Sequence, residues 1–599
     1  MKLFICLFFG MFNLLLCAQT DFDLAENYYD KGEFEKALFI YQKLHKEAPS
    51  NSNFAFRIIE VQQELQHFEE ADAFINHQLS LRNNPQMLVE MGYNFQLQNK
   101  LEQASVYFKK AIAIAKATPD YCYSIALRFE EHSLVDEAIE VYKLAINQTN
   151  NTSYEYRLAG LYAQKKDVQN MFLSYLNFTE NNPTFLSQVY RLFGDYISEN
   201  PDAEYNQILR KILLKKLHTS PSIFWSQMLS WLYTQQKDYQ KALLQEKSIY
   251  RRNSSSLQGV INVGFRAKSD QVYDVTVDAF NFIIQNAQDS KLTIETHRQL
   301  IELELIQSSP QDLNQIQSKY NNLFEIYGRS SETLALQLSY AHFLALYLHN
   351  YPEAISFLKT AINTQLSANE LGRIKLKLAD VLIIDEQFNK ALLYYAQVYT
   401  TLRNSPLAQE ARFKSAKASY YSGDFEWAES QLKVLKSSTS QLIANDALEL
   451  KLLITDHKFG DSLQSPLRQY AKADLLNHQN KKIEAIEVLN RLIQDHSTHA
   501  IVDQALLFQA KLFEQNNQFS NASENYLKII TDFSSEILID DALYAMAELL
   551  RTKLSQDEKA MPYYEKIIFN HPDSIHFVDS NKHYRSLRDK YQKQTTIDL

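Results

Sequence analysis

Glycine and proline are scarce in this sequence, with 11 and 12 residues respectively in a chain of 599. Average proteins use about 7% glycine and about 5% proline. A β-rich or α/β chain of this length needs many more of both, because they form its tight turns. Their scarcity favours long helices joined by short polar turns, and therefore an all-α fold. A single compact core is excluded as well, because chains beyond about 300 residues divide into domains or repeats.

Cysteine is also rare, occurring only as Cys6, Cys17 and Cys122. The first two lie in an N-terminal stretch with the order of a secretory signal peptide. Lys2 precedes an apolar run over residues 3–16, and Ala18 is a small residue before a cleavage point. Once residues 1–18 are removed, only Cys122 remains, so no intramolecular disulfide is expected. We interpret Cys122 as a buried small hydrophobe rather than a nucleophile.

The leader is compatible with three outcomes. Cleavage after Ala18 gives an exported, periplasmic protein. Acylation of Cys17 gives a lipoprotein, although Leu16 is larger than the residue that usually precedes such a cysteine. An uncleaved leader gives an anchor. No later stretch approaches the roughly 18 apolar residues of a membrane span, so we expect a mature chain that is not integral to the membrane. Peripheral association at the inner face of the outer membrane is compatible with this expectation.

Motifs for catalysis, cofactors and metals are missing. The glycines are too scattered for a GxGxxG or phosphate-binding loop, and no His is followed by Glu. His496 and His499 have weak metal spacing, and we interpret them as part of a solvated connection. The net charge of −10 argues against a nucleic-acid binder, which would show a basic surface. The sequence thus predicts a non-enzyme without a cofactor, a metal or a nucleic-acid partner.

A repeating pattern is present from the start of the mature chain. In its first copy, small, aromatic and turn residues occupy regular offsets: Ala25, Tyr28, Gly32, Ala37, Tyr41, Leu44 and Pro49. The slot of Ala37 recurs as Ala71, Ala104, Ala138 and Met171, at intervals of 34, 33, 34 and 33. Only a small side chain lets two crossing helices approach closely, which explains this slot. The aromatic residues fill the space beside the crossing, and Gly32 takes the turn.

The register weakens after Phe185 and returns near residue 331. Ala242 marks one hairpin in the weak region, and the segment Ser308–Asn314 predicts a break and a new helix. Ala354, Ala391 and Ala428 are then 37 apart; after an extra helix near Leu442–His457, the slot recurs as Ala485, Ala522 and Ala560. We predict these segments: a leader (1–18), an N-terminal array (19–185), degenerate repeats (186–330), a 37-residue array (331–440), C-terminal repeats with one extra helix (441–575), and a capping helix and tail (576–599).

These offsets resemble those of tetratricopeptide-repeat proteins, in which each unit of about 34 residues is a helix-turn-helix. The resemblance implies an all-α solenoid of stacked hairpins. The later units look like those of the periplasmic outer-membrane-assembly and Tol–Pal-associated repeat proteins. The resemblance also implies that the second, fifth, ninth, twelfth and thirteenth positions of each unit line a groove. No Lys or Arg occupies these positions in the first units, so a clamp for an acidic C-terminus is not expected.

The residues at and near the implied groove positions are aromatic or acidic. We predict a protein-binding groove at Phe22, Glu26, Asp30, Phe56, Glu60, Glu64, Tyr93, Tyr123, Glu130 and Tyr156. Such a surface would bind a partner segment of apolar and basic character. The competing interpretation is that these aromatic side chains only fill a narrow superhelix.

The function that follows is a non-enzymatic scaffold or adaptor of the bacterial cell envelope, which binds protein segments in the groove. An enzyme built on a solenoid, such as the peptidoglycan lyases, is disfavoured because the repeats leave no room for a catalytic domain. The alternative is an outer-membrane-associated protein that binds glycan or peptidoglycan, a lipoprotein if Cys17 is acylated. Such proteins usually carry many Trp, whereas this chain has 3.

Overall fold

The computed structural model describes residues 21–81, 84–435, 441–458 and 464–597. Within these ranges every regular element is a helix, and none is long and apolar enough to cross a membrane. The all-α prediction is thus confirmed. The predicted leader, with its cleavage and acylation sites, lies outside the described residues. The chain divides at Ala279 and Phe280 into two compact units, unit 1 and unit 2, each described by itself.

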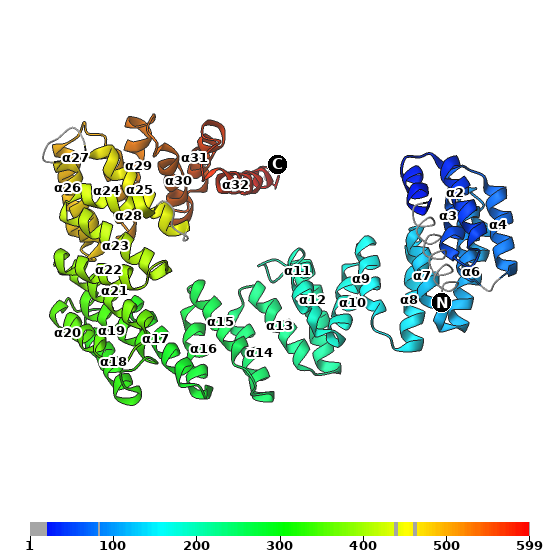
Figure 1. The fold of residues 1–599 in the computed structure, drawn as a ribbon, viewed down its shortest axis with the longest axis horizontal. Coiled ribbons are helices and arrows are strands. Elements are labelled where there is room, and N and C mark those ends of the chain that lie inside the picture. Colours follow the sequence, from blue (N-terminus) through cyan, green and yellow to red (C-terminus); the bar gives the residue numbers. More distant parts are fainter. Residues whose placement is uncertain (1–20, 82–83, 436–440, 459–463, 598–599) are drawn as a thin grey trace, which may run out of the picture. The chain divides into compact units, whose positions relative to one another are not determined.

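Unit 1 begins with a helical stretch at residues 21–30 and continues as antiparallel helices (Figure 1). Its helices are α2 (Phe34–Glu47), α3 (Ser52–Glu64), α4 (Phe68–Leu81), α5 (Gln86–Leu97), α6 (Leu101–Ala117), α7 (Cys122–Glu131), α8 (Val135–Thr149), α9 (Tyr154–Gln164), α10 (Val168–Asn181), α11 (Leu186–Gly194), α12 (Glu204–Thr219), α13 (Ile223–Gln235), α14 (Tyr239–Arg252) and α15 (Gln258–Ser269); α16 (Tyr273–Asn286) spans the boundary.

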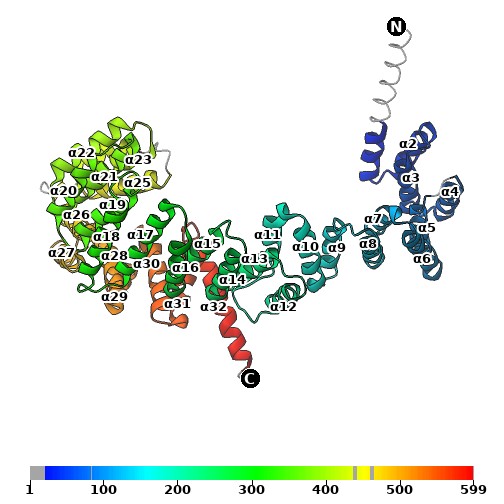
Figure 2. The same cartoon turned by 90° about the horizontal axis from the view of Figure 1, so that it is seen from below.

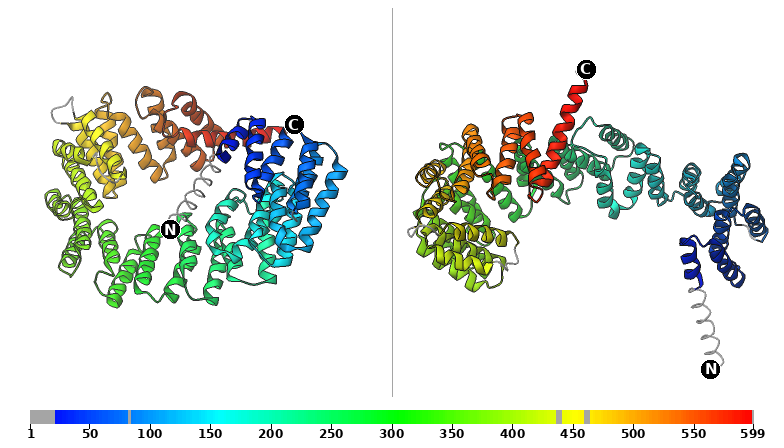
Figure 3. Two further views of the ribbon diagram at one scale, coloured as in Figure 1. Left: turned by 45° about the vertical axis from the view of Figure 1, so that its right-hand side comes forward. Right: turned by 90° about the horizontal axis from the view of Figure 1, so that it is seen from above.

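Unit 2 continues in the same way, and its hairpins follow one another along a curved path (Figures 2 and 3). Its helices are α17 (Ser290–Gln307), α18 (Leu313–Tyr327), α19 (Leu334–Leu346), α20 (Tyr351–Ile362), α21 (Ala368–Ile384), α22 (Phe388–Thr401), α23 (Pro406–Ser422), α24 (Phe425–Leu435), α25 (Gln441–His457), α26 (Ser465–His478), α27 (Lys482–Asp495), α28 (Val502–Gln515), α29 (Phe519–Asp532), α30 (Ile539–Glu548), α31 (Asp557–Asn570) and α32 (Phe577–Ile597).

The small slot lies at the crossing of the two helices of each hairpin, as predicted. Its residues in both units are at most 2% exposed: Ala37, Ala71, Ala104, Ala138, Met171, Ala242, Ala354, Ala391, Ala428, Ala485, Ala522 and Ala560. Four residues later, Tyr41, Tyr395, Tyr526 and Tyr564 are equally buried. The crossing and the ring beside it therefore form the core of each hairpin, and successive hairpins extend it along the unit.

The turn inside each hairpin has a left-handed residue five places before the small slot. Gly32 and Gly423 take this position with φ of 73° and 81°. In the other hairpins the residue is not glycine: Gln66, Asn99, Ser133, Lys166, Lys237, Gln271, His349, Glu386, Asn480, Asn517 and Ser555. Gln271 reveals a hairpin in the weak region, α15–α16, whose crossing residue is the fully buried Thr276.

The helix α25 occupies the segment where the sequence predicts an extra helix. The next helix, α26, contacts α23 in addition to its neighbours in the chain, α25 and α27. At its end, Gln479 donates a 2.9 Å hydrogen bond from its side-chain amide to the carbonyl of Ile384, which ends α21. Lys472 of α26 pairs with Glu386 at 2.9 Å. The extra helix thus places α26 against two earlier hairpins of unit 2.

Candidate functional site

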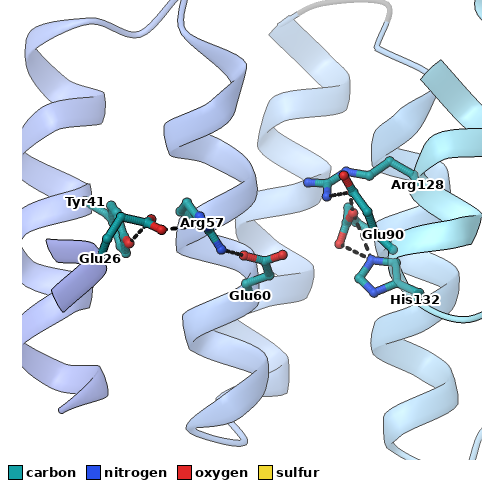
Figure 4. A network of polar contacts seen from close by, with 8 residues as sticks. Glu26, Tyr41, Arg57, Glu60, Glu90, Arg128 and His132 are labelled. Carbon is teal, nitrogen blue, oxygen red and sulfur yellow. Dashed lines mark hydrogen bonds and ion pairs between the residues drawn. The ribbon is translucent and has the colours of Figure 1, made fainter. Parts of the chain in front are cut away.

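The first helices of three successive hairpins in unit 1 lie side by side, because α5 contacts both α3 and α7. Their polar and aromatic side chains form what we call the unit 1 face. It consists of Glu26, Tyr29, Asp30, Arg57, Glu60, Glu64, Glu90, Tyr93, Tyr123, Arg128, Glu130, Glu131, His132 and Arg157. Figure 4 shows part of this region, and all of its labelled residues except Tyr41 belong to the face.

Four of the five predicted groove aromatics are covered by other side chains, Tyr93 among them, whose ring stacks on that of His132. The Phe22 ring lies 5.9 Å from that of Phe54, and Tyr156 packs on Phe178 at 5.3 Å. Phe56 is 9% exposed, and the guanidinium of Arg128 lies 3.7 Å from its ring centre. Tyr123 differs, because it is 43% exposed and only loosely stacked on a neighbouring tyrosine. Tyr123 is therefore the one of these five that offers an exposed ring to a partner.

Arg57 of α3 joins two of the predicted acids. Its guanidinium bonds Glu26, from the helical stretch at residues 21–30, and Glu60, one turn further along α3, both at 2.7 Å (Figure 4). Glu26 also accepts a 2.5 Å hydrogen bond from the buried hydroxyl of Tyr41. This carboxylate thus ties the face to the hairpin core, and both acids are neutralised within the molecule.

Glu90 of α5 is the most buried charge on the face. Its side chain is fully buried and lies 3.1 Å from both the Arg128 guanidinium and the His132 ring, which belong to α7 and the residue after it (Figure 4). Arg128 also pairs with the exposed Glu131. His132 stacks on Tyr93 at 3.8 Å. A carboxylate that is shielded from water needs such partners, because burying an unpaired charge costs roughly several kcal/mol.

Glu64 is exposed at the end of α3 and has no hydrogen-bond or ion-pair partner among the residues that the structure describes. The pKa of the Tyr29 hydroxyl is raised by burial and then by Glu60 and Glu64. The pKa of Tyr93 is raised by burial and then by Glu64 and Glu90. Glu64 thus lies within electrostatic reach of both tyrosines. Asp30 is likewise exposed and unpaired within the described ranges.

Glu130 completes the acidic set at the C-terminal end of the face. It lies 3.6 Å from Arg157. Together with burial, it raises the pKa of the Tyr142 hydroxyl. Every arginine of the face is therefore engaged by at least one carboxylate of the face, while Asp30 and Glu64 carry free negative charge.

The sequence analysis missed Arg57, Glu90, Arg128, His132 and Arg157 as members of the face. A signal for part of this set exists, because Arg57, Glu90 and Arg157 each follow a fifth-position residue directly. The groove positions implied by the resemblance do not include this sixth position. Side chains at this sixth position reach from the first helix of one hairpin toward the first helix of a neighbouring hairpin. They therefore form the ion pairs between hairpins.

Unit 2 has a second set of paired charges on its first helices. Asp380 of α21 lies 2.8 Å from Lys414 of α23 and accepts a 2.7 Å hydrogen bond from Tyr395. Lys414 also pairs with Glu410 at 2.9 Å. The removal of bulk water, with repulsion from Lys377, lowers the pKa of His342 of α19 to about 4. In this set the acidic and basic side chains pair with one another, whereas the unit 1 face has acids that are unpaired among the described residues.

The described residues hold no cluster of His, Cys, Asp or Glu that could bind a metal ion. His496 and His499 lie in the connection between α27 and α28, where the sequence places them. Cys122 is fully buried, its thiol donates to the carbonyl of Ala115 at 3.3 Å, and burial raises its pKa. The burial of Cys122 agrees with its interpretation as a small hydrophobe, whereas His496 and His499 are half-buried and the His499 ring accepts a 3.2 Å hydrogen bond from the amide of Ile501.

No known family model matches this chain, and no curated protein matches it either. Solved structures that it is similar to include Naa15/Naa10 bound to HypK-THB, with 14% identity, a TM-score of 0.28 and coverage of 97% of both chains. The APC/C hetero-tetramer Cut9-Hcn1 has 11% identity and a TM-score of 0.19 over 96% of this chain and 98% of that one. Yeast Tom70 has 13% identity and a TM-score of 0.28, with coverage of 91% of this chain and 94% of that one.

Similarity at these TM-scores carries no functional argument. The class of protein is defined by the chain's own geometry instead. Buried small residues at the helix crossings, left-handed residues at the turns and stacked hairpins make it a tetratricopeptide-like α-solenoid.

Proposed function

We propose that this chain is a non-catalytic protein-binding scaffold, and that the unit 1 face binds a partner segment of basic and apolar character. One observation carries the proposal. The arginines of the face are engaged by its own carboxylates, whereas Glu64 stays unpaired within reach of Tyr29 and Tyr93. The surface therefore offers negative charge and aromatic rings, and it offers no free arginine.

A lysine or arginine from a partner fits this arrangement for two reasons. Charge-assisted hydrogen bonds to a carboxylate are among the strongest that proteins make. A cation over a tyrosine ring gains about 0.5–1 kcal/mol at an exposed site. Tyr123 adds an exposed ring for an apolar neighbour of that cation. An acidic segment would instead meet like charges, which is unfavourable.

The setting that we propose is the bacterial cell envelope. It is supported by the leader pattern of residues 1–18 and by the resemblance of the C-terminal units to periplasmic repeat proteins. The alternative, a lipoprotein that binds glycan, requires an acylated Cys17. Mass spectrometry of the purified protein distinguishes the two, because acylation adds lipid mass to a chain that begins at Cys17, whereas export gives an unmodified chain from Gln19.

Peptide display against the chain from residue 19 tests the binding proposal. We expect enriched peptides to carry Lys or Arg beside apolar residues. Their affinity should fall roughly three- to thirtyfold in a Glu64→Gln, Tyr123→Ala variant, because one exposed ion pair and one ring contact are lost. The matched control is Glu69→Gln, Phe39→Ala, which changes an exposed acid and an exposed ring on second helices. Enrichment of acidic peptides, or equal affinity in the two variants, would overturn the proposal.

A further inference from the structure

A π-helical turn at Leu549–Lys553 extends α30 in the C-terminal part of unit 2. Such turns insert one extra residue and often mark functional sites. The turn ends where the amide of Leu554 donates to the carbonyl of Leu549 at 3.1 Å. Arg551, within the turn, bonds Glu548 and the hydroxyl of Tyr564. The turn thus keeps Arg551 bonded to the hairpin core while Leu550 and Leu554 line a cavity on another side.

This cavity has a volume of about 740 Å³ and lies between the second helices α29 and α31. Its floor is apolar, since Met546, Leu550 and Leu554 follow one another along α30 and the π turn. Phe519 of α29 and Tyr563 of α31 form opposite walls. A volume of roughly 300–1,000 Å³ with a largely apolar lining is typical of binding pockets. Such a volume is large enough for one or two large apolar side chains.

The rim on α31 carries Lys559 and Lys566, which are seven residues apart and flank Tyr563. Both are exposed, and neither pairs with a carboxylate within the described ranges. Lys566 lies 6.0 Å from the Tyr563 ring centre. The opposite rim on α29 carries Ser520, Ser523 and Glu524. One wall therefore carries two lysines, with uncharged lining residues between them, while the other holds a single acid.

The spacing of the lysines distinguishes between occupants. Seven helical residues span about 10 Å along the axis, so a single carboxylate would have to draw both flexible lysine side chains toward its centre, at a cost in side-chain entropy. A helix with two acids seven residues apart matches both, and its side chains at the third or fourth place between them point the same way. An apolar side chain there would enter the cavity floor.

We propose that this cavity docks an amphipathic helix of a partner protein, with an apolar anchor over Leu550 and Leu554 and acidic residues opposite Lys559 and Lys566. This site is separate from the unit 1 face and prefers the opposite charge. Its residues come from α29, from the end of α30 with the π turn and the residues after it, and from α31, whereas the unit 1 face is formed by the first helices of unit 1.

The test uses the chain from residue 19 and two labelled helical peptides, followed by fluorescence anisotropy. The acidic peptide has Glu at two positions seven apart and Leu between them; the basic peptide has Lys in place of Glu. We expect the acidic peptide to bind, and Lys559→Glu, Lys566→Glu to weaken it at least about tenfold. The same variant should gain affinity for the basic peptide, a rescue that altered folding cannot produce.

The matched control is Lys511→Glu, Lys528→Glu, which makes the same charge change at exposed lysines of α28 and α29 outside the cavity. It should leave binding of the acidic peptide within about twofold. The proposal is overturned if the two double variants behave alike or if the acidic peptide does not bind. It is also overturned if dodecanoate, a single carboxylate on an apolar chain, binds in a Lys559- and Lys566-dependent manner while the peptide does not.

Discussion

Glu90 allows the electrostatics of the unit 1 face to be tested with a built-in comparison. Arg128 bonds two carboxylates, of which Glu90 is fully buried and Glu131 has a side chain that is 44% exposed. Breaking a buried ion pair from one side costs about 3–5 kcal/mol. We expect the lower end for Glu90→Gln, about 3 kcal/mol, because Arg128 keeps Glu131 as a partner. Glu131→Gln should cost at most about 1 kcal/mol, because water screens that pair.

Hydrogen exchange in the intact chain measures this difference locally. Each hairpin of a solenoid contacts mainly its neighbours, so the loss should concentrate in α5 and α7. A loss of about 3 kcal/mol lowers amide protection there about 100-fold, since about 1.4 kcal/mol is a factor of ten. Glu131→Gln should lower it less than about tenfold. Equal effects of the two variants would refute the argument that burial of Glu90 makes its ion pairs structurally important, and unit 2 amides report any global change.

Further substitutions test the hairpin core and the pH response. Ala391→Leu should overpack a helix crossing and lower the free energy of unfolding by about 1–3 kcal/mol, whereas Lys390→Leu on the exposed side should change it by less than about 0.5 kcal/mol in urea unfolding. Tyr395→Phe should cost about 1–2 kcal/mol in the same assay, because Asp380 loses a buried donor. The pKa of His342 is lowered to about 4 in the folded state, so unfolding takes up protons below its unfolded value of about 6.5. Stability should therefore fall as pH decreases from about 6.5 toward 4, and His342→Asn should reduce this slope in urea midpoints.

The hairpin core could be predicted from the sequence because its packing demands a small residue at each crossing. Ala37 and its counterparts recur at intervals of 33–34 residues in the first array and 37–38 residues in the later ones, and their burial confirms the register. The hairpin at α15–α16 was missed because its crossing residue is Thr276 and its turn residue is Gln271. A non-glycine residue in the left-handed region costs about 1–2 kcal/mol. Most turns of this chain nevertheless have a non-glycine residue at the left-handed position. These turns therefore cannot be recognised in the sequence by a glycine.

The charge pattern of the candidate face was less accessible to sequence reasoning. The acids Glu26 and Glu60 are visible in the sequence, but their partner Arg57 lies one place outside the implied groove positions. Pairing across hairpins depends on how neighbouring first helices are rotated, and helix periodicity alone does not fix that rotation. The same holds for Phe56, whose ring is covered by Arg128 from a helix two hairpins away. The groove residues as a binding site therefore stay a prediction.

The binding role of the unit 1 face is tested most directly by photo-crosslinking in living cells of the native host. A photoreactive residue at position 123 is compared with one at position 39, since Phe39 of α2 is even more exposed, at 72% against 43% for Tyr123. We predict crosslinks from position 123 to partner peptides that carry Lys or Arg beside apolar residues, and few from position 39. Equal crosslinking at both positions, or acidic peptides at position 123, would contradict a basic-segment-binding scaffold.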